Sequence, residues 1–292
     1  MGVIRAADGT FSLPTMRPLM STATREPDIE RFQQHVYINP ATGVSMPYNL
    51  YLPANYDPTK RYPLLFFVTD ASANINDTKA PLFQGNGATV WAEPGEQKKR
   101  ECIVLAPQYT ADLVESIGMM PTEANQWTPG LSLITNLLFD VIERYSVDER
   151  RIYGTGQSQG GMTNIAISDK YPDLFAGQLL AACQWDVDEM AALKDKNLWI
   201  VVCEGDTKVF PGMNAATARW EALGAKVARN DPFWDSKAPA REMEADIKAM
   251  ERQGAAINYS VFRGGNHMYT WSFAYDIEGL RDWLFRQRAE TP

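Results

Sequence analysis

Residues 151–171 read RIYGTGQSQGGMTNIAISDKY, and this stretch decides the fold class of the chain. A short apolar run leads into a glycine-rich turn around Ser158, and a helical pattern follows. In the motif G-x-S-x-G, Gly156 and Gly160 leave room for a strand and a helix to pass close together. A serine at the tip of such a turn has strained backbone angles and points its hydroxyl outward. The stretch therefore predicts a strand, a sharp turn and a helix that present Ser158 as a nucleophile; the alternative is a glycine-rich turn with a solvated serine.

Apolar runs typical of buried strands recur on both sides of this unit. They are YPLLFFVTD (62–70), CIVLAPQ (102–108), GQLLAAC (177–183), LWIVVCEG (198–205) and INYSVFRG (257–264). Helical patterns lie between them, and the strongest, LSLITNLLFDVIERY (131–145), repeats its apolar residues at spacings of three and four. Strands that alternate with helices indicate an α/β fold with a mostly parallel, twisted sheet covered by helices on both faces. Ligands bind beyond the carboxyl ends of the strands in such sheets.

The regions outside this alternating core have distinct patterns. Residues 1–27 show no period and predict an N-terminal arm, whereas 28–292 fit one catalytic domain. The runs FQQHVYI (32–38) and YNLYLP (48–53), joined by a turn-like stretch, predict an antiparallel N-terminal hairpin. Residues 226–256 form a long insertion before the last strand, and we expect a lid, a pocket wall or a solvated excursion there.

Composition excludes several classes of protein. The chain is 45% hydrophobic with a formal net charge of −8. It has no apolar run of membrane-spanning length and no cluster of Lys and Arg, which argues against a membrane span and against a nucleic-acid partner. Cys102, Cys183 and Cys203 lie in apolar runs and are expected to pack in the core, without disulfides. The first residues lack a signal-peptide pattern, so we expect a cytoplasmic protein, or a secreted one whose signal peptide has been removed. The sequence is compatible with a homo-oligomer.

The residues that could activate Ser158 follow the later strands. The chain contains two histidines. His35 lies in the entry hairpin, whereas His267 follows the last predicted strand, so His267 is the candidate base. A carboxylate should come between Ser158 and His267 in the chain. Asp206, at the end of LWIVVCEG, is preferred over Glu204, Asp231 and Asp235; alternatively, it only caps the following helix.

Backbone donors and aromatic residues complete the predicted site. A tetrahedral intermediate needs two N–H donors, for which we expect the amides of Gln159 and Ala71. The loop after Ala71 lacks the glycine and the glutamate of a calcium loop, so neither a metal nor another cofactor is expected. Four tryptophans near predicted strand ends or catalytic loops are candidates for substrate contacts, although most aromatic residues serve the core: Trp127, Trp185, Trp234 and Trp271.

Between Tyr48 and Trp283 the chain resembles α/β-hydrolase esterases related to the prolyl oligopeptidase clan, often called predicted peptidases. It is also similar to polyhydroxybutyrate depolymerase and feruloyl esterase-like enzymes. The resemblance is carried by PYNLYLPANYDPTKRYPLLFFV, VLAPQY, YSVDERRIYGTGQSQGGM and YPDLFAG, in that order. Relatives usually have His-Gly-x-Gly where this chain has residues 69–72, TDAS. They also often space the Gly and Asp of the acid loop by two residues, where this chain has Gly205-Asp206.

The resemblance implies an α/β-hydrolase fold and a serine esterase acting on small or aryl esters, with Ser158, His267 and Asp206 as its triad. The alternatives are a serine peptidase of the same clan and a catalytically inactive binding module. No β-propeller precedes the core in the sequence, so ester cleavage is expected to dominate. The expected partner is a small apolar or aromatic ester.

Overall fold

The computed structural model describes residues 26–122, 124–238 and 240–290. Residues 1–25 of the expected N-terminal arm lie outside this part of the chain. Nine strands form one sheet in the order β1-β2-β4-β3-β5-β6-β7-β9-β8. Their bounds are β1 Gln33–Ile38, β2 Ser45–Tyr51, β3 Tyr62–Val68, β4 Ile103–Pro107, β5 Val147–Gln157, β6 Gly177–Ala181, β7 Leu198–Cys203, β8 Val227–Arg229 and β9 Ile257–Phe262.

The sheet is mostly parallel. Strands β3 to β9 pair in parallel, whereas β1 pairs with β2 and β2 with β4 in antiparallel register. This arrangement confirms the predicted fold class, including the antiparallel N-terminal hairpin. The sequence patterns did not predict β8, because its three residues are too few for a period to be visible.

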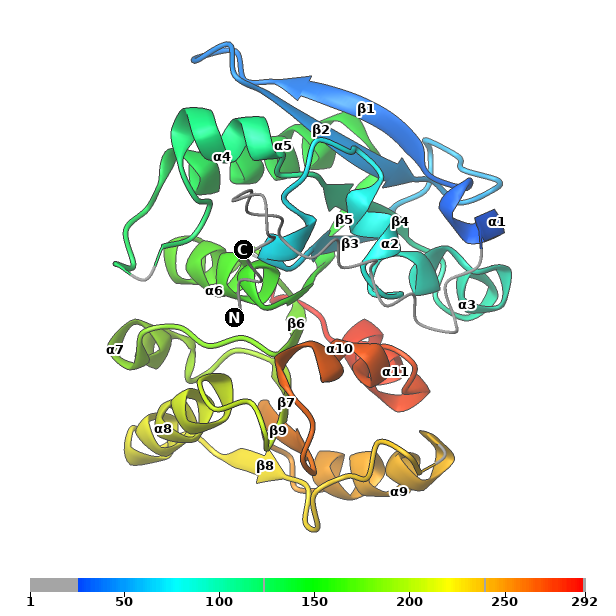
Figure 1. Cartoon of the computed structure of the whole chain (residues 1–292). Helices are drawn as coiled ribbons and strands as arrows, with labels where there is room; N and C mark the ends of the chain where they lie inside the picture. Colours follow the sequence, from blue (N-terminus) through cyan, green and yellow to red (C-terminus); the bar gives the residue numbers. More distant parts are fainter. Residues whose placement is uncertain (1–25, 123, 239, 291–292) are drawn as a thin grey trace, which may run out of the picture.

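Helices cover both faces of the sheet (Figure 1). One layer holds α4 to α8, and the other holds α1 to α3 and α9 to α11. Their bounds are α1 Glu26–Ile29, α2 Ala80–Phe83, α3 Pro94–Lys99, α4 Ala111–Ile117, α5 Pro129–Arg144, α6 Gln159–Lys170, α7 Val187–Met190, α8 Val209–Ala222, α9 Ala240–Glu251, α10 Trp271–Ala274 and α11 Glu278–Arg286.

The central strands are apolar on both sides because each side faces a helical layer. In β3, Leu64, Phe66 and Val68 pack with the layer of α5 and α6. Leu65 and Phe67 point the other way and pack with the layer of α11. All seven residues of β3 are buried, so the strand reads as a continuous apolar run and not as an alternating one. β3 therefore lies in the interior of the sheet, next to β5, the strand that Ser158 follows.

All three cysteines are buried and unpaired. Cys183 packs with the layer of α5 and α6, whereas Cys102 and Cys203 pack with the layer of α11. Burial raises the pKa of the Cys183 thiol to about 12 and that of Cys203 to about 11. These side chains therefore serve as small apolar core residues, as expected from the sequence.

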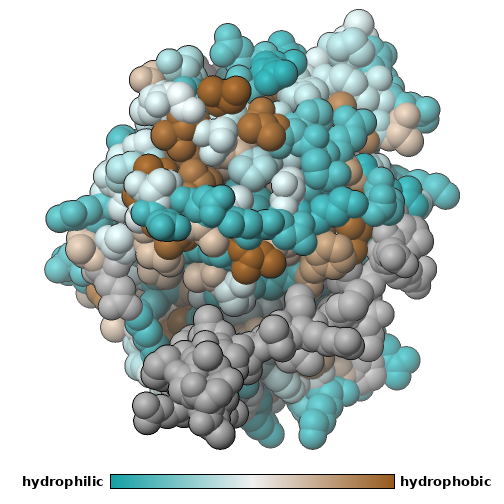
Figure 2. Space-filling view, turned by 45° about the horizontal axis from the view of Figure 1, so that its top comes forward, coloured by the Kyte–Doolittle hydropathy of each residue, from teal (hydrophilic) through white to brown (hydrophobic). Residues whose placement is uncertain are grey.

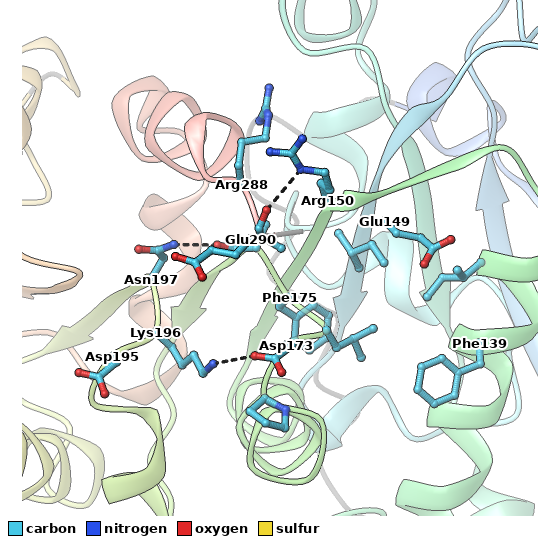
Figure 3. Close-up of a pocket in the computed structure, with 16 residues that line it drawn as sticks. Phe139, Glu149, Arg150, Asp173, Phe175, Asp195, Lys196, Asn197, Arg288 and Glu290 are labelled. Carbon is cyan, nitrogen blue, oxygen red and sulfur yellow. Dashed lines mark hydrogen bonds and ion pairs between the residues drawn. The ribbon is translucent and has the colours of Figure 1, made fainter. Parts of the chain in front are cut away.

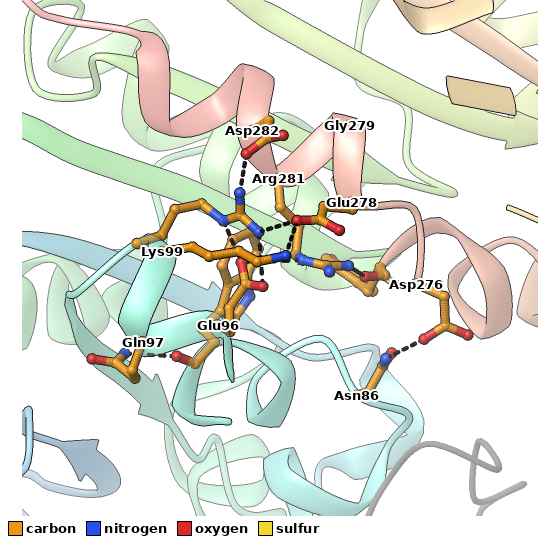
Figure 4. Close-up of polar contacts among 12 residues, drawn as sticks. Asn86, Glu96, Gln97, Lys99, Asp276, Glu278, Gly279, Arg281 and Asp282 are labelled. Carbon is orange, nitrogen blue, oxygen red and sulfur yellow. Dashed lines mark hydrogen bonds and ion pairs between the residues drawn. The ribbon is translucent and has the colours of Figure 1, made fainter. Parts of the chain in front are cut away.

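A buried ion-pair cluster joins α3 to α11 (Figure 4). The Arg100 guanidinium, at the end of α3, forms ion pairs with Glu96 on the same helix and with Glu278 and Asp282 on α11. Arg281 adds a second guanidinium 3.2 Å from the Glu96 carboxylate. The side chains of Glu96 and Arg100 are only 5% and 6% exposed. A buried charge of this kind depends on its partners, since water cannot replace them.

Arg100→Ala is expected to lower the free energy of unfolding by about 3–5 kcal/mol, because it leaves the buried Glu96 carboxylate undercompensated. Lys99→Ala is the matched control on the same helix. Lys99 also pairs with Glu278, but its side chain is 55% exposed, so its loss should cost at most about 1 kcal/mol. Urea unfolding measures both changes. Equal effects of the two substitutions would contradict the importance of the buried cluster.

The surface carries scattered apolar side chains. On the face drawn in Figure 2, hydrophobic groups are separated by hydrophilic ones. Val36 and Ile38, on the edge strand β1, are 61% and 64% exposed. Within residues 26–122, 124–238 and 240–290, no helix combines the length and the apolar character needed to cross a membrane.

Candidate active site

Ser158 lies in a sharp turn between β5 and α6. Its backbone has φ 52° and ψ −116°, a conformation with positive φ that non-glycine residues rarely adopt. The Ser158 amide donates a hydrogen bond of 3.0 Å to the carbonyl oxygen of Ala181, at the end of β6. This bond holds the strained turn against the neighbouring strand. The serine hydroxyl is thereby presented at the carboxyl edge of the sheet.

The two glycines of the motif are required by close backbone contacts. A Cβ atom on Gly160 would lie 1.8 Å from the carbonyl oxygen of Val68. A Cβ atom on Gly156 would lie 2.6 Å from the carbonyl carbon of Gly160. No side chain fits at either position, because β3, β5 and α6 meet there backbone to backbone. This explains physically why G-x-S-x-G occurs at this turn.

His267 and Ser158 are in hydrogen-bond contact. The Nε2 atom of His267 lies 2.7 Å from the Ser158 Oγ, although 109 residues separate them in the chain. His267 begins the short 3-10 helix η4 (His267–Tyr269), which follows β9 after a loop that contains Gly264 and Gly265. Its side chain is 38% exposed, so the imidazole is open to solvent and to a ligand. A base placed in this way can accept the serine proton.

Asp206 completes a line of three side chains. Its Oδ2 lies 2.5 Å from the Nδ1 of His267. The other oxygen, Oδ1, accepts hydrogen bonds from the amides of Lys208 (3.2 Å) and Val209 (3.0 Å) at the start of α8. The side chain of Asp206 is 5% exposed. One oxygen of Asp206 therefore caps a helix start, and the other contacts the imidazole. The role of Asp206 as the acid of a triad stays a prediction.

The loops that carry Asp206 and His267 are packed together through glycines. The Gly205 amide donates to the Gly264 carbonyl (3.0 Å), and a Cβ atom on Gly205 would lie 2.0 Å from the Gly265 carbonyl oxygen. Gly264 and Gly265 have positive φ angles of 63° and 74°. Glu204, another candidate acid, instead accepts the Gly264 amide at 3.0 Å. The direct Gly205-Asp206 spacing thus fits a close loop pair in this chain.

Residues 226–256, predicted as an insertion, pack beside the loop that carries His267. They add β8 at the sheet edge and α9, whose Ile247 and Met250 pack in the α11 layer of the core. The Ser236 hydroxyl in this segment is hydrogen-bonded to the Tyr269 hydroxyl, two residues after His267. Asp235 accepts the Lys237 amide at 2.9 Å and makes an exposed local turn. The segment therefore braces the end of β9; a role as a lid stays a prediction.

Of the four candidate tryptophans, Trp271 contacts the His267 side chain. Its ring meets the His267 ring edge to face, with centroids 5.4 Å apart. Trp185 is 6% exposed and follows β6 at the same edge of the sheet. Trp127 packs against Tyr171 at the end of α6 away from Ser158. Trp234 is buried between β9 and α9. The structure thus brings Trp271 to the site and places Trp127 and Trp234 elsewhere.

The two predicted oxyanion donors lie on segments that are tied to each other. Ala71 begins the short 3-10 helix η1 (Ala71–Ala73) after β3, and Gln159 begins α6. Within the described residues, neither amide has a hydrogen-bond acceptor. The Gln159 and Asn74 side chains exchange two hydrogen bonds of 3.1 Å each. The two amides are therefore unpaired and held on linked segments.

Sequence reasoning missed the glutamines that hold the loop of Ala71. Gln84 bonds the residues on both sides of Ala71, and Gln157 bonds Gln84. Gln108 donates to the carbonyl oxygens of Ala73 (2.7 Å) and Ile75 (2.6 Å). In the sequence, the one indication of this hydrogen-bond network was the pair of glutamines on either side of Ser158, in GQSQG. Polar residues inside an otherwise apolar unit need partners, which these loop contacts supply.

A separate pocket of about 740 Å³ lies at the amino-terminal ends of the strands (Figure 3). It is lined by apolar side chains, including Phe139 and Phe175, and by charged ones such as Glu149, Arg150 and Lys196. Because Ser158 follows the carboxyl end of β5, this pocket lies at the opposite edge of the sheet. It takes no part in the site built around His267.

Among the described residues, no three His, Cys, Asp or Glu side chains lie together as metal ligands. Ser158, His267 and Asp206 are joined by two hydrogen bonds. The chemistry that this arrangement supports is proton transfer coupled to nucleophilic attack.

Comparisons with known proteins bear on the fold. No family model and no curated protein matches the sequence. Among solved structures, a thermostable esterase has a TM-score of 0.70 at 24% identity, covering 90% of this chain and 64% of its own. The chain has the α/β-hydrolase fold. This chain thus spans less than two thirds of that esterase.

Two further solved structures with this fold are a feruloyl esterase module and a putative dipeptidyl aminopeptidase. A mutant feruloyl esterase module from Clostridium thermocellum, complexed with sinapinate, has a TM-score of 0.60 at 14% identity, with coverage of 96% and 99%. A putative dipeptidyl aminopeptidase IV from Bacteroides ovatus has a TM-score of 0.55 at 14% identity, covering 88% of this chain and 36% of its own. At these identities the likeness establishes the α/β-hydrolase fold alone.

Proposed function

We propose that the chain is a serine carboxylic ester hydrolase that acts through an acyl-enzyme on small apolar or aromatic esters. The observation that carries the proposal is the line of hydrogen bonds from Ser158 Oγ to His267 and Asp206, at 2.7 and 2.5 Å. The strained serine turn at the carboxyl edge of the sheet supports it. Esterase structures among the fold neighbours agree with it.

In the proposed first step, Ser158 Oγ forms a bond to the ester carbonyl carbon while its proton moves to Nε2 of His267. Asp206 holds the Nδ1–H and stabilises the imidazolium. The negative charge on the carbonyl oxygen is bound by the amides of Gln159 and Ala71, which have no other acceptor among the described residues. The tetrahedral intermediate then expels the alcohol, which takes the proton from Nε2. Water repeats the sequence to release the acid and free Ser158.

The substrate class is proposed from the fold neighbours. They include a feruloyl esterase module complexed with sinapinate, an aromatic acid, which supports an aromatic ester as substrate. Trp271 and Trp185 are 4% and 6% exposed, so little of either ring is open to a ligand. Trp271 instead packs edge to face against the His267 ring and supports the position of the imidazole.

A fluorophosphonate probe tests the proposed mechanism directly. We expect one phosphonyl group per chain, attached to Ser158 and located by peptide mass spectrometry, because the base that activates Ser158 toward esters also activates it toward phosphorus. Denatured protein is the control and should not react. Absence of an adduct, or an adduct on another residue, would overturn the proposal.

Peptide bond cleavage is the second candidate, favoured by the aminopeptidase-like fold neighbour. The same three side chains can serve an amide substrate. Rates on aryl esters and on short peptide anilides, measured with the same preparation, distinguish the two activities. Faster turnover of the anilides would make peptide cleavage the leading candidate.

A further inference from the structure

We infer that Gln84 is a positioning residue that sets the oxyanion donor of Ala71 against the nucleophile, an inference that rests on the serine hydrolase function proposed above. The Gln84 side chain forms four hydrogen bonds. Its Oε1 accepts the Asp70 amide (2.7 Å) and the Gln157 Nε2 (2.8 Å). Its Nε2 donates to the Ser72 hydroxyl (2.7 Å) and to the Asp70 carboxylate (3.3 Å). Both lone-pair positions and both N–H groups of the amide are used.

The partners of Gln84 flank the two reacting positions. Asp70 and Ser72 are the residues directly before and after Ala71, and Gln157 directly precedes Ser158. Gln157 also donates to the backbone carbonyl of Gln84, at 3.0 Å. One side chain therefore connects the loop that carries the proposed donor to the turn that carries the nucleophile.

Burial gives these bonds a fixed geometry. Gln84 is 7% exposed and Gln157 is fully buried, so water cannot replace a lost partner without rearrangement. The loop itself is short, and η1 contains three residues. Without Gln84, Asp70 and Ser72 would lose their side-chain bridge to Gln157, although β3 would stay paired with β5 up to Val68 and Gly156. The Ala71 amide would then be held less firmly relative to Ser158, and an oxyanion donor must lie within a few tenths of an ångström of its position.

Gln84→Ala is expected to lower kcat for an aryl ester by about 10- to 100-fold, with KM changed by less than about twofold, because a misplaced donor affects the transition state more than the bound ester. Gln97→Ala is the matched control. Gln97 also holds backbone groups, donating to the carbonyls of Trp91 (2.6 Å) and Cys102 (3.2 Å), but it lies before β4, away from the turn of Ser158. Its kcat should equal that of the wild type.

Gln84→Glu adds a readout that a purely structural role would not change. The protonated carboxyl keeps one donor and the acceptors of the amide, whereas the ionised form has no donor and repels the Asp70 carboxylate. Burial beside Asp70 raises the pKa of such a carboxyl. The ratio of variant to wild-type kcat should therefore rise as pH falls, because the ratio removes the pH effects that the two proteins share. A ratio that stays flat or falls with decreasing pH would overturn the inference. This test does not depend on Gln84→Ala, so it applies even if that variant does not fold.

An aryl trifluoromethyl ketone forms a tetrahedral adduct with a serine. It therefore tests separately whether Gln84 helps to stabilise the tetrahedral transition state. Its inhibition constant should rise in Gln84→Ala by the same factor by which kcat/KM falls. Unequal changes would contradict a role at the oxyanion.

If Ser158→Ala retains the wild-type rate, the proposed function itself fails. If Ser158→Ala is inactive while Gln84→Ala keeps wild-type kcat, only the role of Gln84 fails.

Discussion

Ser158→Ala is expected to lower kcat for an aryl ester by a factor of about 10⁴ or more, because the acyl-enzyme can no longer form. The substitution removes one atom, and the turn that holds the residue is set by Gly156, Gly160 and the Ala181 carbonyl. The folded structure should therefore persist. Single-turnover and steady-state rates, measured with circular dichroism of the same samples, check the result.

Ser168→Ala is the control for that experiment. Ser168 lies on α6, the helix that directly follows Ser158, and is buried. Its kcat should match the wild type, so a loss of activity confined to Ser158→Ala cannot come from a general change in the helix. An unchanged rate in Ser158→Ala would point to a binding module, with the measured activity due to a contaminating enzyme.

Asp206→Asn is expected to lower kcat by about 10³- to 10⁴-fold while leaving the protein folded. One oxygen of Asp206 accepts two amides at the start of α8. The carboxamide oxygen of Asn would keep those bonds, which turns its NH₂ group toward His267. The imidazole must then accept at Nδ1 and carry its proton on Nε2, the tautomer that cannot take a proton from Ser158. Steady-state kinetics near neutral pH measure the loss.

Asp235→Asn separates this effect from a general loss of charge near the site. Asp235 was a candidate acid in the sequence, but its carboxylate accepts a local amide on an exposed turn. The substitution should leave kcat within about twofold of the wild type, as surface changes of this kind usually have small effects. A large loss in Asp235→Asn, or a small one in Asp206→Asn, would require a different acid.

The fold and the contacts among the candidate site residues were predictable because each rests on a local pattern. Continuous apolar runs such as β3 reflect burial on both faces, and the position of a polar residue after such a run places it at the carboxyl edge. Ser158, Asp206 and His267 each follow a strand in this way. Their contacts within 2.7 Å could then be anticipated from the topology of a parallel sheet, although they lie far apart in the chain.

The amide network around the loop of Ala71 was not predictable. Gln84 follows a four-residue helix with no clear period, and its partners come from separate segments of the chain. The choice of partners by a carboxamide depends on atomic positions after folding, which residue type and spacing do not encode. Trp127 was a candidate because of its place near a predicted strand end or catalytic loop, but its ring packs against Tyr171, at the end of α6 away from Ser158.

The division of the three thiols between the two helical layers makes them internal reporters of local opening. Cys183 reports on the layer of α5 and α6, whereas Cys102 and Cys203 report on the layer of α11. A buried thiol becomes reactive toward alkylating reagents only when its surroundings open. The order in which the three side chains are alkylated under mild denaturation therefore reveals which side of the sheet separates first, without the introduction of a label.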